Sequence, residues 1–387
     1  MERIYLDHAA TTPLDERVLA AMLPFFRGQY GNASSAHSLG RMARDAVEES
    51  RERIAAHLNA HPSEIVFTSG GTEGDNAALC GMLMHTRGQL VTSAAEHAAI
   101  LGAARILEAT GHDLVLLHPE ASGRVSAQQV SEALTPATGL VSVAFVNNEL
   151  GTVAPIRAIS RVCRAAGVPL HTDAVQAAAV LALDVEALGV DLLTLSGHKI
   201  YGPKGVGVLY VRGGLDFRPF IAGGSQERRR RGGTENVPAI AGMAKALDLV
   251  AACGQEEAAR LTSVRKQFEQ CLLNELGDSF VFNTPIDGGA APHILSIAVK
   301  PKGGKQIDGE MLLLNLDLEG VMASAGSACS SGAVQVSHVL RAVGLDETLA
   351  SAAVRFSLGR STTTEDVSEA ARRLGRIVRR MRKQRTA

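Results

Sequence analysis

Residues 195–205 read Leu-Ser-Gly-His-Lys-Ile-Tyr-Gly-Pro-Lys-Gly and place one lysine, Lys199, in a turn of small residues. An apolar run at 190–195 leads into this turn, and Asp173 ends a second apolar run that begins at residue 167. A lysine in a tight turn near an aspartate at a strand end is the pair that pyridoxal phosphate (PLP) requires. The lysine holds the aldehyde, and the acid keeps the ring nitrogen protonated. A surface lysine in a glycine loop is the alternative interpretation.

The composition is typical of a soluble enzyme. The 387 residues suffice for two domains that share a site, and 46% are hydrophobic. The net charge of −1 argues against a nucleic-acid binder that works through a general positive field. The N-terminus has no apolar core of signal-peptide length, and no apolar run approaches the roughly 20 residues of a membrane span. The five scattered cysteines include no CxxC pair, which favours reduced thiols over disulfides or a zinc site. We therefore expect a cytoplasmic protein without metal, membrane or nucleic-acid binding.

Short β-rich runs alternate with longer helical runs over most of the chain. We expect strands at 65–68, 90–92, 113–117, 140–146, 168–171, 191–195 and 206–211, with helices at 75–84 and 98–110 among them. Nearly continuous apolar strands separated by helices indicate a mostly parallel sheet covered on both faces. From residue 239 a helical stretch reaches 276, and strands at 293–299 and 354–358 then alternate with helices.

These patterns predict an α/β fold with a large domain and a smaller α+β domain. The large domain is expected to contain residues 15–252. The small domain is expected to combine residues 1–14 with residues 253–387.

Polar residues follow several of the expected strands, at the edge where open α/β sheets bind ligands. The loop Ser69-Gly70-Gly71-Thr72 offers N–H groups and a hydroxyl at a helix start, where a phosphate is favoured. An ordinary turn with Thr72 as N-cap is the alternative. His97 could stack on a ring or move protons, or it could be structural. The asparagines of Asn147-Asn148-Glu149 could equally be turn formers.

A series of short motifs occurs in order along nearly the whole chain. They are Tyr5-Leu6-Asp7-His8-Ala9-Ala10-Thr11-Thr12-Pro13, Gly31-Asn32-Ala33-Ser34-Ser35-Ala36-His37, the Ser69 loop, Glu96-His97, Val146-Asn147-Asn148-Glu149-Leu150-Gly151, His171-Thr172-Asp173-Ala174-Val175-Gln176, the Lys199 stretch, Arg231-Gly232-Gly233-Thr234, Ser327-Ala328-Cys329-Ser330-Ser331 and Val354-Arg355-Phe356-Ser357-Leu358-Gly359-Arg360. Together they resemble the cysteine desulfurases of the nitrogen-fixation and iron–sulfur-cluster type, which are PLP enzymes of the class-V aminotransferase superfamily.

The resemblance implies the fold of type I PLP-dependent transferases and a role for each cofactor-binding residue. Lys199 would carry the cofactor, Asp173 would pair with the ring nitrogen, and His97 would stack on the ring. Gln176 and Asn148 would bond its phenolic oxygen. The phosphate would be held by Gly71, Thr72, Ser196 and His198. In this family the partner subunit's Thr234 also reaches the phosphate, so a homodimer is implied.

Two further roles concern the substrate, which the resemblance implies is L-cysteine. Arg355, with Asn32 and Asn148, would bind the substrate carboxylate, because a guanidinium can bond both oxygens at once. A structural ion pair is the alternative for Arg355. Cys329 lies in a run of small residues, 323–332, that is typical of a surface loop.

By the resemblance, Cys329 takes the substrate sulfur as a persulfide, L-alanine is released, and the sulfur passes to an iron–sulfur scaffold or another acceptor protein. The attack requires a thiolate. His97 is the candidate for moving protons near the sulfur.

Other functions stay open at this point. They are a selenocysteine lyase or another class-V aminotransferase-like enzyme, a non-catalytic sulfur-relay partner, and a general α/β ligand-binding protein. The Cys329 loop counts against an aminotransferase. Lys199, Asp173 and His97 together count against a non-catalytic role.

Overall fold

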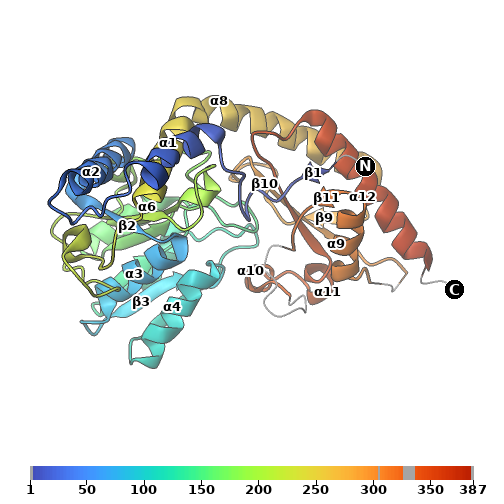
Figure 1. Cartoon of the computed structure of the whole chain (residues 1–387). Helices are drawn as coiled ribbons and strands as arrows, with labels where there is room; N and C mark the ends of the chain where they lie inside the picture. Colours follow the sequence, from blue (N-terminus) through green and yellow to red (C-terminus); the bar gives the residue numbers. More distant parts are fainter. Residues whose placement is uncertain (1–2, 304–305, 326–335, 385–387) are drawn as a thin grey trace.

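The computed structural model describes residues 3–303, 306–325 and 336–384, which form two lobes (Figure 1). In the described part of the chain, the larger lobe has a seven-stranded sheet in the order β2-β8-β7-β6-β5-β3-β4. These strands are β2 (Ile65–Thr68), β3 (Gln89–Ser93), β4 (Leu114–Leu117), β5 (Thr138–Ser142), β6 (Leu170–Asp173), β7 (Leu192–Ser196) and β8 (Gly207–Val211). Every pairing that lacks β8 is parallel. The expected mostly parallel α/β sheet is confirmed.

Strand β8 is the exception, because it runs antiparallel to both β7 and β2. Only residues 197–206 connect β7 to β8. A parallel return needs a crossover of roughly a dozen residues or more, so this short connection turns the chain back on itself. Lys199 ends the single 3-10 turn in this connection, Gly197–Lys199.

Both faces of the sheet are covered. Neighbouring strand residues belong to different hydrophobic cores, as Leu192 and Leu193 of β7 show. Side chains alternate between the faces of a strand, so each face must pack against its own layer. Helices α3 (Gly71–Leu83) and α4 (Ala98–Ala109) cover one face. The other large-lobe helices are α1 (Glu16–Arg27), α2 (Ser38–Leu58), α5 (Ala127–Ala133), α6 (Ile156–Ala165) and α7 (Val185–Leu188).

The smaller lobe combines the C-terminal elements with the N-terminal strand. Strands β9 (Phe280–Phe282), β10 (Ile294–Val299) and β12 (Ala353–Ser357) form an antiparallel sheet in the order β12-β10-β9. Strand β1 (Ile4–Tyr5) pairs in parallel with β11 (Val321–Met322), so the N-terminus lies in this lobe (Figure 1). The helices here are α9 (Gly309–Leu318), α10 (His338–Ala342), α11 (Glu347–Ala350) and α12 (Thr364–Gln384).

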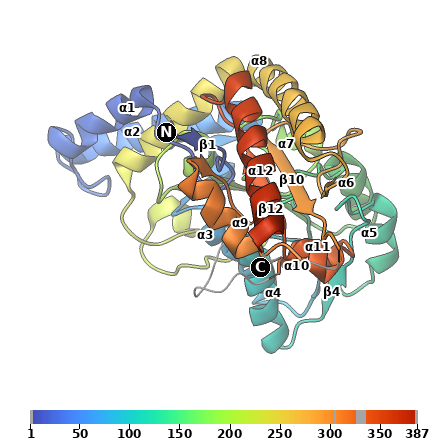
Figure 2. The same ribbon diagram turned by 90° about the vertical axis from the view of Figure 1, so that its right-hand side faces the viewer.

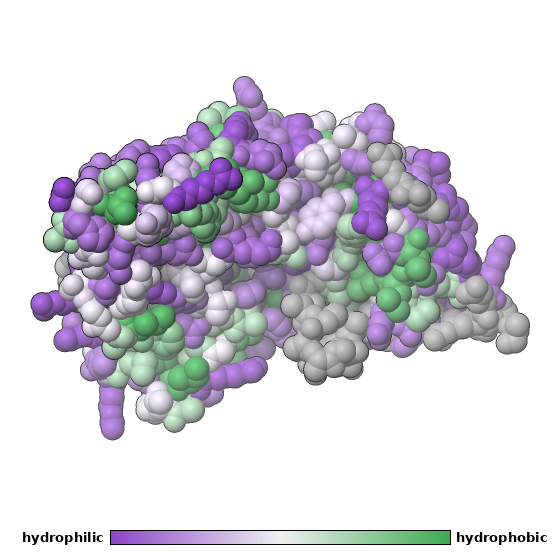
Figure 3. All heavy atoms as spheres, in the orientation of Figure 1, coloured by the Kyte–Doolittle hydropathy of each residue, from purple (hydrophilic) through white to green (hydrophobic). Residues whose placement is uncertain are grey.

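Helix α8 (Val237–Leu276) runs along both lobes and packs against α1, α2 and α12 (Figures 1 and 2). It is the one helix in the described ranges with the length and hydropathy of a membrane span, yet 56% of that window is buried in the structure. Hydrophilic residues predominate along the upper edge of the face in Figure 3, over α8. These observations describe a core helix. The expected domain limit at residue 252 falls inside α8 and stays a prediction.

The expected strand at 140–146 ends earlier, at Ser142. Beyond it, the backbone N–H of Phe145 still bonds to the carbonyl of Asp173, and Val146 bridges Val153. The apolar run continues past the strand because Val143, Phe145 and Val146 are buried where the chain leaves the sheet.

A buried ion pair holds the loop between β8 and α8. Arg51 of α2 bonds to Glu227 at 2.8 Å and stacks 4.7 Å from the Phe67 ring. Glu227, Arg228 and Arg229 all have positive φ, at 45°, 53° and 65°. This conformation is costly for residues with a Cβ, so the surrounding contacts must impose it. The Arg51–Glu227 pair supplies such a contact at the start of the strained turn.

The variant Glu227→Gln is expected to lower the free energy of unfolding by about 1.5 to 3 kcal/mol, because it removes the buried carboxylate and leaves Arg51 paired only with the more exposed Glu48 at 3.2 Å. Urea unfolding followed by circular dichroism measures this change. The matched control is Glu347→Gln, which breaks the exposed pair with Arg341 and should cost less than about 1 kcal/mol. Equal, small losses in both variants would contradict the prediction.

Candidate active site

The predicted site residues come together at the carboxyl edge of the large sheet. Asp173 ends β6 and Ser196 ends β7, three residues before Lys199. The Ser69 loop follows β2, and His97 follows β3. Because parallel strands end at the same edge, the fold brings these separate loops close to one another.

The Lys199 amine is held by backbone carbonyls. Its Nζ donates to the carbonyl oxygens of Ala9 at 2.5 Å and Ala10 at 2.7 Å. Burial and the positive charge of Arg355 lower the pKa of Lys199 to about 8, against the opposing effect of Asp173. The amine is therefore much easier to deprotonate than an ordinary lysine, whose pKa is about 10.4.

The Asp173 carboxyl is buried at the end of β6, and its Oδ1 accepts from the backbone N–H of Val175 at 2.8 Å. Burial raises its pKa, while the bond from Val175 and the charges of His97 and Lys199 act in the opposite direction. A cation brought to this carboxylate would be held strongly, because little water is present to screen the pair.

Small residues and donors meet at the start of α3. Gly70 is the N-cap residue with a φ of 154°, and Gly71 is the first helical residue. A Cβ on Gly71 would lie 3.0 Å from Cγ2 of Val175 and 3.7 Å from Cβ of Ser196, so Ser196 adjoins the loop. Thr72 is exposed in the first turn. The alternative in which Thr72 caps the helix is wrong, because Gly70 occupies that position.

Two histidines flank these groups. His198 lies within 3.2 Å of the Thr11 hydroxyl through Nδ1, and burial followed by the charge of Lys199 lowers its pKa to about 4. His97 caps α4, where Nδ1 accepts from the backbone N–H of Ala99 at 3.2 Å. Desolvation by the surrounding protein, together with the charge of Lys199, lowers the pKa of His97 against the opposing effect of Asp173. The pKa of each ring thus lies below its ordinary value, which favours the neutral form.

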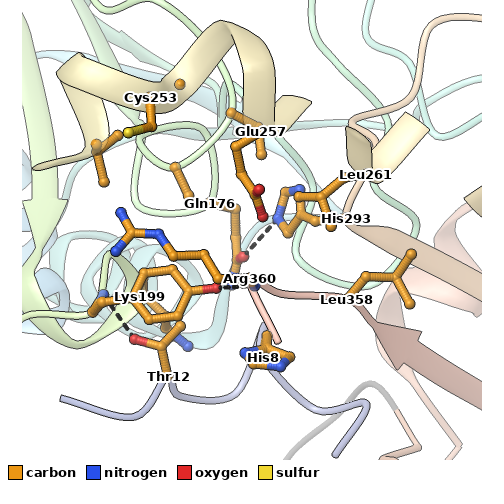
Figure 4. Close-up of a pocket in the computed structure, with 15 residues that line it drawn as sticks. His8, Thr12, Gln176, Lys199, Cys253, Glu257, Leu261, His293, Leu358 and Arg360 are labelled. Atoms are coloured by element: carbon orange, nitrogen blue, oxygen red, sulfur yellow. Dashed lines mark hydrogen bonds between the residues drawn. The ribbon is translucent and has the colours of Figure 1, made fainter. Parts of the chain in front are cut away.

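A cavity of about 30 Å³ lies beside Lys199 where the lobes meet (Figure 4). Gln176 lines it and donates through Nε2 to the carbonyl of Ala9 at 2.9 Å. Nε2 of His293 lies 3.4 Å from Oε1 of Gln176, and burial lowers the pKa of His293 to about 3. The Gln176 amide thus has protein partners of its own, and the predicted bond to a cofactor oxygen stays a prediction.

Arg355 is anchored from two sides. Its Nη2 pairs with Oδ1 of Asp7 at 3.1 Å, and its Nη1 donates to the backbone carbonyl of Asn148 at 2.8 Å. The structure therefore contains the ion pair that was the alternative interpretation of Arg355. Asn32 is exposed, and its side-chain oxygen accepts from the backbone N–H of Ser34. A substrate role for these residues stays a prediction.

One predicted residue, Thr234, belongs to a loop that contacts the start of α3. Thr234 is exposed on the loop between β8 and α8, and its side chain makes no hydrogen bond within the described ranges. Arg231 of the same loop bonds to Glu73 in the first turn of α3. Cys329 lies outside the described residues.

Sequence reasoning missed several contributors. The sequence could not indicate that the backbone carbonyls of Ala9 and Ala10 bind Lys199, because every residue has a backbone carbonyl. His293 also went unnoticed. Asp75 and Glu96 are both buried acids. The sequence offered a signal for Asp75, because it is a charged residue on the buried side of the predicted helix 75–84.

The chemical groups of this site fit PLP. Lys199 supplies an easily deprotonated amine for an aldehyde, and Asp173 supplies a buried acid for a ring nitrogen. The start of α3, beside Ser196, supplies N–H groups and hydroxyls for a phosphate.

Comparison with known proteins places the chain in a family. Residues 4–369 match the family model described as Aminotransferase class-V. The chain is 43% identical over 385 residues to the putative cysteine desulfurase IscS 1 of Bacillus subtilis (strain 168), covering 98% of this chain and 100% of that protein. It is 44% identical over 385 residues to the cysteine desulfurase IscS of Anaeromyxobacter dehalogenans (strain 2CP-C), covering 98% and 93%.

Solved structures agree with this placement. A NifS-like protein superposes with a TM-score of 0.90 at 34% identity, covering 98% of this chain and 100% of that chain. A structure described as SspA in complex with cysteine has a TM-score of 0.81 at 37% identity, covering 92% and 98%. These likenesses confirm the resemblance found in the motifs and the type I fold. The chain belongs to the class-V aminotransferase family and, within it, to the cysteine desulfurases.

Proposed function

We propose that this protein removes the sulfur of L-cysteine with PLP as cofactor, releases L-alanine and carries the sulfur as a persulfide on Cys329. The observation that carries the proposal is the Lys199 amine, half-buried near Asp173 at the carboxyl edge of the sheet with its pKa lowered to about 8. The full-length similarity to cysteine desulfurases supports the choice of substrate.

The chain's own groups would hold the cofactor at its two ends. Asp173 would pair with the ring nitrogen, and Lys199 would bind the aldehyde. The phosphate would lie against Gly71 and Thr72, with Ser196 and His198 beside them. When bound, PLP supplies an aldehyde that captures amines and a ring that withdraws electrons from the substrate.

Lys199 would also act as the base of the reaction. An amine with a pKa of about 8 is partly neutral at physiological pH, so it can take a proton and return it. Its two carbonyl partners, on Ala9 and Ala10, hold the amine in place without neutralising its charge. His97 would face the cofactor ring and move protons near the sulfur.

Arg355 would bind the substrate carboxylate, with Asn32 and Asn148 nearby. Its existing bonds to Asp7 and to the Asn148 carbonyl orient the guanidinium. Positioning by such bonds lowers the entropy that is lost when the carboxylate binds.

The overall reaction balances without an added oxidant. L-cysteine and the Cys329 thiol give L-alanine and the Cys329 persulfide: one C–S bond breaks, one S–S bond forms, and the thiol proton ends on alanine. The attacking group must be the thiolate.

Family membership supports a proposal for the assembly and the compartment. We infer a homodimer in which the partner subunit's Thr234 completes the phosphate site, because Thr234 is exposed within one chain. The cytoplasm is the proposed compartment, and an iron–sulfur scaffold or another acceptor protein would take the sulfur. The iron–sulfur role is suggested by the IscS names of the relatives.

The Lys199 amine is expected to react with acetic anhydride with a half-maximal rate near pH 8 in protein freed of cofactor. Below this pH the amine is protonated and unreactive, and above it the neutral nucleophile dominates. Mass spectrometry of the labelled peptide measures the profile, with exposed Lys204 as the internal reference. A half-point near pH 10, as for an ordinary lysine, would show that burial has no such effect.

The variant Lys199→Ala is expected to lose more than about 100-fold in the rate of alanine formation, because both the aldehyde anchor and the base are removed. The control is Lys204→Ala, which removes an exposed lysine from the same turn and should leave the rate unchanged. Normal turnover by Lys199→Ala would overturn the proposed function.

The variant Cys329→Ser should still bind PLP and shift its visible absorbance when L-cysteine is added, but it should release no sulfide under reductant. The reason is that the sulfur acceptor is gone while the amine site is intact. Cys271→Ser, at a partly buried cysteine of α8, is the matched control and should turn over normally. Sulfide release by Cys329→Ser at the normal rate would remove Cys329 from the mechanism.

A further inference from the structure

Three carboxyl groups are buried together beneath the carboxyl edge of the sheet. Asp75, Glu96 and Asp173 have exposed fractions of only 1%, 2% and 9%. Asp75 comes from α3, Glu96 from the turn before α4, and Asp173 from the end of β6. Three carboxylates this close in a medium of low polarity repel one another strongly, so they cannot all be ionised.

Asp75 is in direct contact with Asp173. Its carboxyl lies within side-chain hydrogen-bonding reach of the Asp173 carboxyl and of the Thr194 hydroxyl. Oδ1 of Asp75 lies 3.8 Å from Nε2 of His171 and accepts no hydrogen bond within the described part of the chain. A hydrogen bond between two carboxyl groups requires a proton on one of them.

Among the described residues, no lysine or arginine forms an ion pair with Asp75. His171 is fully buried, with Nδ1 2.9 Å from the Ser142 hydroxyl and Nε2 3.0 Å from the Thr194 hydroxyl. Burial lowers the pKa of His171 to about 3, so the ring is neutral. Glu96 does not stabilise an ionised Asp75 either, because it is itself an acid. Burial raises the pKa of Glu96 to about 8.

The surroundings decide which carboxyl carries the proton. Asp173 accepts a backbone N–H from Val175 and lies near the positive charge of Lys199, both of which favour its ionised form. Burial and the negative charge of Asp173 raise the pKa of Asp75 and favour its neutral acid, against the smaller opposing effect of the Thr194 hydroxyl. The shared proton therefore belongs to Asp75, and the hydrogen bond runs from Asp75 to Asp173.

We propose that Asp75 is a positioning residue for the reaction: as a neutral acid, it donates a hydrogen bond to the Asp173 carboxylate and so keeps Asp173 ionised against the ring nitrogen of PLP. This inference rests on the proposed function, since it concerns the cofactor that Asp173 would bind.

The chemical consequence concerns a single proton. A donor at Asp173 makes its carboxylate less basic, so the proton shared with the ring nitrogen stays on the nitrogen. Without the donor, Asp173 becomes more basic and competes for that proton. A ring that loses its proton withdraws electrons less well, so the chemical step slows while substrate binding does not.

The test compares two substitutions at one position in the complete enzyme loaded with PLP. Asp75→Leu keeps the branching of the side chain but removes the donor, and Asp75→Asn keeps a donor but cannot ionise. The nitrogen-15 resonance of labelled PLP reports directly whether the ring nitrogen is protonated. Steady-state kinetics with L-cysteine separate kcat from KM.

We expect Asp75→Leu to shift the ring-nitrogen resonance toward the unprotonated position and to lower kcat about 10- to 100-fold with little change in KM, the size typical of a hydrogen bond to an ion. Asp75→Asn should restore both the resonance and most of kcat. Thermal unfolding of each variant shows whether it is folded at the temperature of the kinetic measurements. If Asp75→Leu does not fold, Asp75→Val serves the same comparison with a smaller side chain.

Two results would overturn the inference. One is an unchanged resonance and kcat in folded Asp75→Leu or Asp75→Val. The other is a loss in Asp75→Asn as large as that in Asp75→Leu, which would mean that the ionisable carboxyl acts and the donor does not. If the unsubstituted protein binds no PLP, the proposed function fails instead, so the two failures are distinguishable.

Discussion

The active site depends on backbone hydrogen bonds made by the segment between β1 and α1. The Ala9 carbonyl accepts hydrogen bonds from both the Lys199 amine and the Gln176 amide. A few residues before it, β1 pairs with β11 of the smaller lobe. One short stretch of backbone therefore connects the lysine turn to the smaller lobe. Because backbone carbonyls are neutral acceptors, they position the amine without a counter-charge, and burial can lower its pKa.

The same logic governs the other titratable groups. Burial keeps His171 and His293 neutral, with their pKa values lowered to about 3, and it raises the pKa of Glu96 to about 8. Neutral neighbours do not screen the remaining charges, so Lys199 and Asp173 interact in surroundings of low polarity. Such a site suits a cofactor whose reactivity depends on one protonated nitrogen.

Much of the large lobe could be predicted from the sequence. Apolar runs bounded by small and polar residues located every strand of the large sheet, because buried strands must be apolar on both faces. The apolar runs did not predict the direction of β8, because they carry no sign of pairing direction; the short connection at 197–206 was the available signal. The cap at Gly70 could not be predicted either, because it depends on local backbone geometry.

The sequence by itself determined the family, the fold class and the identity of the groups that carry chemistry, because these depend on residue types in a fixed order. Only the tertiary structure decided their environment. It placed Ala9 and Ala10 against Lys199, Asp7 against Arg355 and Asp75 beneath Asp173. Each of these contacts joins segments far apart in the chain. Their strength depends on burial, which arises only when the lobes and layers pack together.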